Sequence, residues 1–397
     1  MRTPATALAT PSRQVEVRVL RGPDALADAE HHYRYLWSRT DPMPPMLEYA
    51  WARTWWDLHA DEGELFLVLA EIDRQPVGMA PLYIRGRERG VRGALRTMCF
   101  LGTGEPAAEE VYGTNNGWLA APEHQTLISD AVVDALREHR SEWDRVWLAN
   151  IAPDARIASD VETGLQDDLL SSEITETCNW IVDVPATLDD YYARIPETKL
   201  RTKLRAVLKR ADKAGVEVER ARSVGRALEM FEELIEIHTR QWEGRGHAGA
   251  CSSPVFREFH RRMIAYFAQQ DLLWMLRSTV GEQTIAVRYG FHTGRTFYDY
   301  IGGIDQELRR HAPGIMTTLR LVEQGPEVGF DALDLLAGDY GYKHRVSNRQ
   351  LPLVTLEGYG KTPAARAFVA LRTMRDRVRQ AIPRNGTAET PGAGQGD

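Results

Sequence analysis

The stretch from Tyr298 to Gly325, YDYIGGIDQELRRHAPGIMTTLRLVEQG, predicts a strand, a polar turn and an apolar-striped helix. A helix N-terminus after a strand binds anions well, because its first N–H groups lack partners and the helix dipole is positive there. Pro313 suits a first helical turn, and Gly314 allows close approach to the backbone. We therefore expect a phosphate seat at this turn, with a tight corner as the alternative. Its residues are Arg309, Arg310, His311, Ala312, Pro313, Gly314 and Ile315.

A second group of polar side chains follows the predicted strand FDALDLLAG at 330–338. These residues are Asp339, Tyr340, Tyr342, Lys343 and His344. Sites in α/β proteins tend to form at the C-terminal ends of strands, so we expect Tyr342 and Lys343 to be catalytic and the first two residues to bind substrate. The alternative is a solvated loop whose tyrosines pack on the sheet.

The strand at 296–303 supplies the other candidate catalytic groups, Asp299 and Tyr300. Their side chains point to opposite faces, because strands alternate with a period of two, and the sequence leaves open which one faces a cleft. Asp305, His292 and His311 are nearby alternatives for a proton acceptor.

A long glycine-rich segment, HTRQWEGRGHAGACSSP at 238–254, separates two predicted helices. Long connections in compact domains are often functional, so we expect Trp242, Arg245 and His247 to contact substrate, with a mobile surface loop as the alternative. Cys251 has no visible Cys-His-Asp framework, and we do not expect it to be a nucleophile.

The composition is that of an ordinary globular protein. The chain has 397 residues, 43% hydrophobic and 26% charged, which predicts about two domains. The net charge of -7 argues against a nucleic-acid or anionic-membrane binder. The three cysteines form no CxxC pair, so we expect no metal site and a reducing cytoplasm. The apolar runs are far shorter than the ~20 residues of a membrane span, and the N-terminus lacks the apolar core of a signal peptide.

Hydrophobic patterns place the elements in two similar halves. The first half has strands at 65–72, 77–85, 95–102, 144–151 and 179–184, with helices at 25–59 (broken at 41–46) and 126–137. The second has helices at 197–215, 226–242, 256–269 and 315–323, with strands at 272–280, 283–294, 296–303, 330–338 and 349–356. The hairpins at 67–87 and 274–295 can be overlaid, which favours a duplicated α/β unit.

Four stretches resemble the CelD-like (cellulose-biosynthesis-type) branch of the GNAT acyltransferase superfamily. They are residues 282–325, residues 330–348, the basic helix TKLRTKLRAVLKRADKAG at 198–215, and GMAPLYIRGR…LRTMCFLG at 78–102. Together they cover most of residues 60–365. That branch is similar in turn to the Fem-type aminoacyltransferases, which also pair two GNAT-like units.

The resemblance implies an α/β (α+β) fold of two tandem GNAT-like units, each a mixed, mostly antiparallel sheet flanked by helices. The N-terminal unit would be 15–185, without its own cofactor site, and the acyltransferase unit would be 186–365. A helix at 366–382 would follow, and tails at 1–14 and 383–397 would be disordered. The first unit would frame the acceptor cleft, with Glu109, Glu110 and Tyr112 lining it or lying on a surface loop.

The resemblance also implies a reaction. Acetyl-CoA or another acyl-CoA would be the co-substrate, with its pyrophosphate on the 309–315 turn. The family motif Arg/Gln-x-x-Gly-x-Gly/Ala keeps Gly314 here, but RRHAPG lacks the earlier glycine. A small-molecule or saccharide-type acceptor would attack the thioester directly through an amine or hydroxyl. A tyrosine would protonate the departing thiolate, Lys343 would neutralise it, and no metal would take part. A monomer or a dimer would suffice.

Two other functions stay open at this point. The basic helix at 197–215 can be a solvated face, can hold an anionic substrate, or can contact tRNA in an aminoacyl-tRNA-dependent transferase of Fem type. The imperfect glycine pattern also allows a degenerate GNAT scaffold with a non-catalytic binding role.

Overall fold

The computed structural model describes residues 15–40, 44–86, 95–152, 156–244, 246, 248–338 and 341–381, so both predicted tails lie outside the described residues. The strands of the first half are β1 (Val15–Leu20), β2 (Gly63–Ile72), β3 (Gln75–Arg85), β4 (Thr97–Phe100), β5 (Leu119–Ala120), β6 (Arg145–Ile151) and β7 (Leu169–Asp183). Those of the second half are β8 (Val216–Arg220), β9 (Leu273–Val280), β10 (Gln283–Thr293), β11 (Thr296–Ile304), β12 (Ala332–Asp334) and β13 (Arg349–Gly360).

The helices of the first half are α1 (Ala25–Asp28), α2 (Glu30–Arg39), α3 (Tyr49–His59), α4 (Gln125–Glu138) and α5 (Ile157–Gly164). Those of the second half are α6 (Leu188–Ala193), α7 (Thr198–Lys213), α8 (Val224–Glu243), α9 (Pro254–Gln269), α10 (Pro313–Val328), α11 (Lys343–Val346) and α12 (Pro363–Ala381). Among the described residues, no helix combines the length and the apolar character needed to cross a bilayer.

The two halves repeat one plan. Each has an antiparallel hairpin, β2–β3 or β9–β10. Each then has a parallel pair of strands joined through a helix, β4 and β6 through α4, and β11 and β12 through α10. The predicted α/β fold of two tandem GNAT-like units is therefore confirmed.

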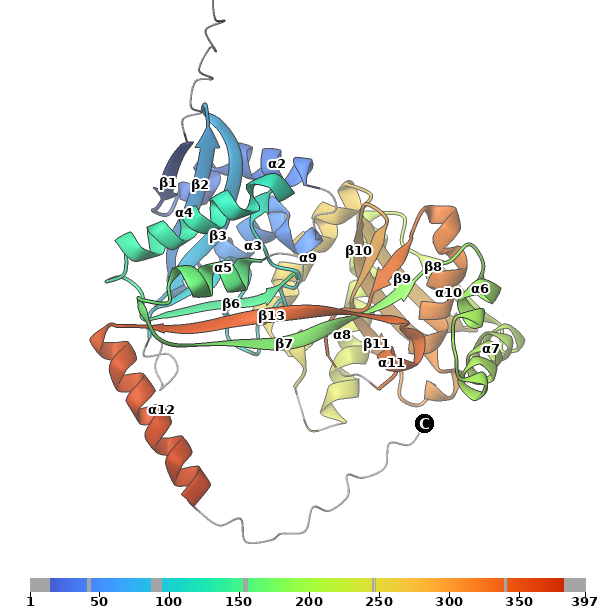
Figure 1. The fold of residues 1–397 in the computed structure, drawn as a ribbon. Helices are drawn as coiled ribbons and strands as arrows, with labels where there is room; N and C mark the ends of the chain where they lie inside the picture. The colour runs from blue at the N-terminus through green and yellow to red at the C-terminus, as the bar shows by residue number, and fades with distance from the viewer. Residues whose placement is uncertain are drawn as a thin grey trace, which may run out of the picture.

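The halves exchange their last strands. The sheet order is β1-β2-β3-β4-β6-β13-β7-β12-β11-β10-β9-β8, with β5 paired to β3 off this path. β7 closes the first half in sequence but pairs antiparallel with β12, whereas β13 closes the second half and pairs antiparallel with β6. β7 and β13 also pair with each other and form the long ribbon that crosses the molecule in Figure 1. The division of the chain between 185 and 186 stays a prediction, because each half contributes a strand beside the other.

One hydrophobic core joins the two halves on one face of the sheet. Trp51 and Trp55 of α3 belong to the same buried cluster as Phe231 of α8 and Phe259 of α9. The Trp51 and Phe259 rings meet edge to face with centroids 4.8 Å apart. On the opposite face the halves have separate cores, one under α4 and α5 and one under α6, α7 and α10. Burial of the large aromatic side chains therefore holds the units in one fixed arrangement.

The structure departs from the predicted elements mainly where polar strands occur. β7 begins at Leu169, ten residues before the predicted strand. The sequence did not predict this part of the strand because Ser171–Thr177 are exposed and show no apolar alternation. β12 is shorter than the predicted strand at 330–338 and ends at Asp334.

Candidate active site

The parallel strands β11 and β12 separate after only three residue pairs. Thr296–Tyr298 pair with Ala332–Asp334, after which β12 ends while β11 continues to Ile304. A cavity of about 410 Å³, the first cavity, opens beside the uncovered part of β11. Its walls include Asp299, Tyr300, Ile301, Gly302, Gly303, Ile304, Arg288, Gly314, Thr317, Leu335, His238, Gln241, Trp242, Gly341, Tyr342 and Lys343.

The N-terminus of α10 forms one wall of the first cavity. Ala312 caps the helix in the left-handed conformation (φ 49°, ψ 51°), and no side chain caps it. The first helical hydrogen bond runs from the Met316 N–H to the Ala312 carbonyl, so the N–H groups of Gly314 and Ile315 precede it. A Cβ added at Gly314 would find its nearest neighbour, Arg288, 4.0 Å away. This end of the helix is therefore open to an anion.

Two arginines stand directly before this helix end. Arg309 and Arg310 lie on a 3-10 turn, Arg309–His311, and both side chains are exposed. Within the part of the chain that the structure describes, neither one forms an ion pair. The turn thus offers two uncommitted positive charges beside the N–H groups of α10, an arrangement suited to phosphate.

Buried charges line the first cavity on the side of β11. The Arg288 Nη1 atom lies 3.1 Å from Asp299 Oδ2, and Arg288 also donates to Thr318 Oγ1 (2.9 Å) and to the Gly314 carbonyl (3.0 Å). Burial raises the pKa of Asp299, although the positive charges of Arg288 and Lys343 act in the opposite direction. Asp299 is thus a charge partner that fixes Arg288 against the start of α10.

Lys343 occupies the junction between the sheet and α11. Its Nζ atom donates to the carbonyls of Ala337 (2.7 Å) and Leu336 (3.3 Å). Burial lowers the pKa of Lys343 to about 8, although the charges of Asp299 and Asp334 raise it. At neutral pH the ammonium group is therefore mostly protonated, and it loses its proton as the pH rises through about 8.

Asp334 connects this site to the first half. Its Oδ2 atom accepts hydrogen bonds from Asn179 of β7 (2.9 Å) and from Asn115 (3.4 Å), and its Oδ1 atom accepts from the Leu336 N–H (2.8 Å). Burial raises the pKa of Asp334 to about 6 in spite of these bonds. The polar network therefore spans the exchanged strand and both units.

A second cavity of about 350 Å³ lies between the two units. It shares His238, Trp242, Tyr300, Ile301 and Lys343 with the first cavity, and its other walls include Ala107, Glu110, Tyr112, Gly249, Ala250 and Phe256. The Tyr300 hydroxyl donates to the Val111 carbonyl in the loop of the first half. The two cavities therefore adjoin across the residues that they share.

The equivalent opening in the first half is closed by the chain itself. β4 and β6 also separate early, after Met98 and Val146. Asn116 then bridges to Ile151 of β6, and β5 pairs with Gly78 and Met79 of β3. The segment from Asn116 to Ala120 thus fills the space beside β4 and β6. The corresponding space in the second half, between β11 and β12, stays open.

The structure brings together six of the predicted site residues. Asp299, Tyr300, Tyr342, Lys343, Gly314 and Trp242 all line the first cavity. The predicted seat residues Arg309, Arg310, His311, Ala312, Pro313 and Ile315 lie on the turn and the first residues of α10, beside the cavity rather than in its wall. Arg245, His247, Asp339 and Tyr340 lie outside the described residues.

Two of the alternative proton acceptors, His292 and Asp305, have other partners, whereas the Nε2 atom of His311 is buried without a hydrogen-bond partner among the described residues. The His292 Nε2 atom lies 2.8 Å from the Asp271 carbonyl, and Asp305 accepts from the Glu307 N–H at 2.8 Å. Burial raises the pKa of the Cys251 thiol to about 12, which is unsuited to a nucleophile at neutral pH.

Two residues of the cavity walls were missed by the sequence analysis. Arg288 is a single charge within the apolar strand QTIAVRYG, a signal that could have been noticed. His238 lines both cavities, and burial lowers its pKa to about 4, so its imidazole is neutral at pH 7. It lies on the apolar face of α8 together with Leu234 and Ile235, where a core histidine is the ordinary expectation.

Residues 198–344 match the family model described as "Acetyltransferase (GNAT) domain". No curated protein matches the chain. The solved structure of FemX has 12% identity and a TM-score of 0.57, covering 86% of this chain and 98% of FemX. A C-terminal domain from Agrobacterium fabrum, provisionally described as belonging to a lysylphosphatidylglycerol synthetase, has 10% identity and a TM-score of 0.52, with 88% and 96% coverage. A conserved protein of unknown function from Bacteroides thetaiotaomicron has 11% identity and a TM-score of 0.51, with 86% and 100% coverage.

At these identities the structural similarities establish the fold alone. The match at 198–344 includes α7, the hairpin β9–β10, the separated strands and the N-terminus of α10. Residues 198–344 thus match a GNAT acetyltransferase domain, and the chain shares its overall fold with FemX.

Proposed function

We propose that the protein is an acyl-CoA-dependent acyltransferase that uses acetyl-CoA and acts on a polar small-molecule or saccharide-type acceptor. The observation that carries this proposal is the first cavity, which opens between β11 and β12 at the uncapped end of α10. A CoA pyrophosphate would lie against the N–H groups of Gly314 and Ile315, with Arg309 and Arg310 beside it. The missing glycine of the family motif is replaced by Ala312, which adopts the left-handed conformation that glycine favours.

The thioester would extend along the uncovered edge of β11. Backbone N–H groups on such an edge can polarise a carbonyl as an oxyanion hole does. The acceptor nitrogen or oxygen would attack the thioester carbon and lose its proton to water, the C–S bond would break, and the thiolate would leave. The ammonium of Lys343, which lines both cavities, would stabilise or protonate that thiolate, and Tyr342 stands beside it.

The acceptor would enter through the second cavity. His238 and Trp242 line both cavities, so they stand where donor and acceptor would meet. The neutral His238 imidazole would accept a hydrogen bond from the attacking group and orient it. The first unit would contribute Glu110 and Tyr112 to the acceptor side, and its own closed opening supports a unit without a separate cofactor site.

Titration calorimetry tests the donor half of this proposal. Acetyl-CoA should bind in one-to-one stoichiometry, and S-acetyl-N-acetylcysteamine, which has the thioester without the pyrophosphate, should bind at least a hundredfold more weakly. Absence of acetyl-CoA binding at millimolar concentration would reject the acyl-CoA function and leave a binding scaffold. An untargeted search for acylated products, with and without the enzyme, would then identify the acceptor and place the protein within or outside the CelD-like branch.

Aminoacyl transfer from tRNA is the second candidate. The exposed face of α7 favours it, because Lys199, Lys203, Lys209, Arg210 and Lys213 are exposed there and form no ion pair with the described residues. The FemX similarity supports the shared fold and not the substrate. Binding of tRNA with a steep salt dependence would favour this alternative.

A further inference from the structure

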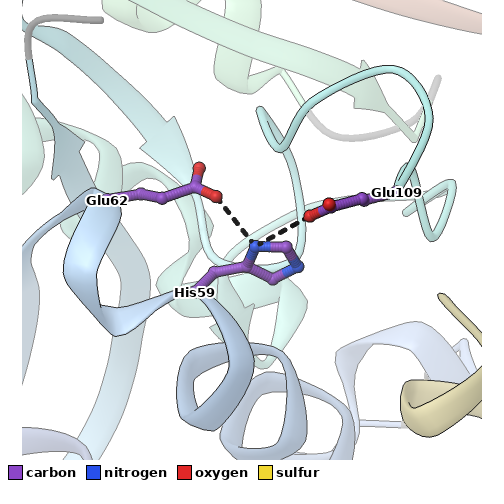
Figure 2. Close-up of side chains that lie close together, drawn as sticks. All are labelled: His59, Glu62 and Glu109. Atoms are coloured by element: carbon purple, nitrogen blue, oxygen red, sulfur yellow. Dashed lines mark hydrogen bonds and ion pairs between the residues drawn. The ribbon is translucent and has the colours of Figure 1, made fainter. Parts of the chain in front are cut away.

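Two neighbouring side chains, His59 and Glu62, meet the distant Glu109 at the end of α3. His59 is the last residue of that helix, Glu62 ends the 3-10 turn Ala60–Glu62, and Glu109 lies on the loop between β4 and β5. Figure 2 shows both carboxylates directed at one imidazole nitrogen. The His59 Nδ1 atom is 3.0 Å from Glu62 Oε1 and 3.8 Å from Glu109 Oε2. All three atoms lie within 4.8 Å of one another, which is compatible with binding one ion.

The cluster has more buried acceptors than donors. The His59 side chain is only 1% exposed, and its Nδ1–H can satisfy one carboxylate at a time. Glu62 Oε2 is buried without a hydrogen-bond partner, as is Oε2 of Glu105, an almost fully buried neighbour on the same loop as Glu109. Among the residues that the structure describes, no lysine or arginine forms an ion pair with Glu62 or Glu109. A carboxylate oxygen that is buried without a cation is costly, so the side chains that the structure describes supply too little positive charge at this cluster.

The pair of His139 and Glu142 resembles the pair of His59 and Glu62, but it has a cation beside it. His139 Nδ1 and Glu142 Oε1 are 2.7 Å apart at the same i,i+3 spacing. There, however, Arg21 supplies the cation, 2.8 Å from Glu142 Oε2. The His139 pair is therefore complete without a ligand and serves as the natural control.

We propose that His59, Glu62 and Glu109 bind a divalent transition-metal ion, with Zn²⁺ as the ion of best fit. Imidazole nitrogen together with carboxylate oxygen suits Zn²⁺, whereas Ca²⁺ and Mg²⁺ prefer oxygen ligands alone. Three protein ligands leave at least one coordination position for water.

The ion would tie α3 to the loop that builds the second cavity. Glu109 precedes Glu110, and Ala107, Glu110 and Tyr112 line that cavity. The Val111 carbonyl between them accepts the Tyr300 hydroxyl hydrogen bond. Metal binding at His59 would therefore fix the wall of the second cavity, although none of the three ligands lines either cavity. This role is independent of the reaction that the protein catalyses.

The test uses the full chain after treatment with a chelator. Calorimetry with ZnCl₂ should show one saturable site, and Glu62→Gln and Glu109→Gln should each weaken it at least tenfold. Glu142→Gln should leave the affinity unchanged. Both glutamates of the cluster are partly exposed, at 26% and 28%, so the isosteric variants should fold, which circular dichroism would check.

A structural readout completes the test. Zn²⁺ should protect the loop between β4 and β5 from limited proteolysis, and Glu109→Gln should abolish this protection. Absence of saturable Zn²⁺ binding by the wild-type chain would overturn the proposal. Equal Zn²⁺ affinity of the Glu62 and Glu109 variants and the wild type would overturn it as well.

Discussion

Gly314→Glu should weaken acetyl-CoA binding strongly while the protein stays folded. Gly314 is the second residue of α10, and a side chain there has open space, with Arg288 as its nearest neighbour at 4.0 Å. A glutamate in the first turn also interacts favourably with the helix dipole, so the variant should be as stable as the wild type. Any loss of binding would therefore report on the anion seat and not on unfolding.

The size of the effect follows from what the carboxylate displaces. A ligand phosphate would lose the helix-end interaction, worth up to ~2 kcal/mol. It would also meet a like charge, which costs about 1 kcal/mol at 4 Å in water. The sum of about 3 kcal/mol corresponds to a rise in Kd of roughly a hundredfold. Calorimetry with acetyl-CoA at constant ionic strength measures this ratio directly.

The chain contains a matched control for this experiment. Gly225 is also the second residue of a helix, α8, and a Cβ there meets no atom within 4 Å. Gly225→Glu adds the same charge at an equivalent position that borders neither cavity, and it should leave the affinity unchanged. The reasoning fails if Gly314→Glu binds acetyl-CoA as well as the wild type does, or if both variants lose affinity equally.

Three further outcomes are expected. The rate of CoA release, measured with an acceptor found by screening, should fall as the pH rises through about 8, because Lys343 is protonated below its pKa and neutral above it. Lys343→Met should lower this rate ~10- to 100-fold. Lys343→Arg should remove the fall in rate at alkaline pH, because arginine stays protonated there. A charge-reversed variant, Lys203→Glu with Arg210→Glu, should leave acetyl-CoA binding intact and should flatten the salt dependence of binding only if tRNA is a ligand. Glu48→Gln should reduce the free energy of unfolding by ~1–3 kcal/mol in urea titrations, because the buried carboxylate accepts hydrogen bonds from Arg34 of the same unit and from Tyr266 of the other unit, both at 2.8 Å. Unchanged stability would show that the Tyr266 contact does not hold the units together.

The sequence predicted the local elements of the second half well. The amphipathic helices α7, α8 and α9 and the strands β9, β10 and β11 lie within two residues of their expected bounds. Their apolar faces repeat at the spacing of their own secondary structure, so each one can be identified without its neighbours. The same holds for the turn before α10, whose Pro-Gly pair signals a helix start.

Strands without an apolar pattern could not be predicted this way. Much of β7 is polar and exposed, and it is a strand because β13 pairs with it along its length. The exchange of β7 and β13 between the halves is likewise invisible to local patterns, since it depends on pairing between residues about 150 or more positions apart. The early end of β12, which opens the first cavity, has the same origin.

The sequence by itself determined the residue types for a phosphate seat and a polar cluster, because a helix start and a strand end are local properties of the chain. Only the tertiary structure decided which of these side chains meet. It placed Arg288 and His238 in the same cavity as Asp299 and Lys343, and it joined His59 to Glu109 across fifty residues. Burial then shifted the pKa values of His238, Asp299 and Lys343, because long-range packing decides how far each group is removed from water.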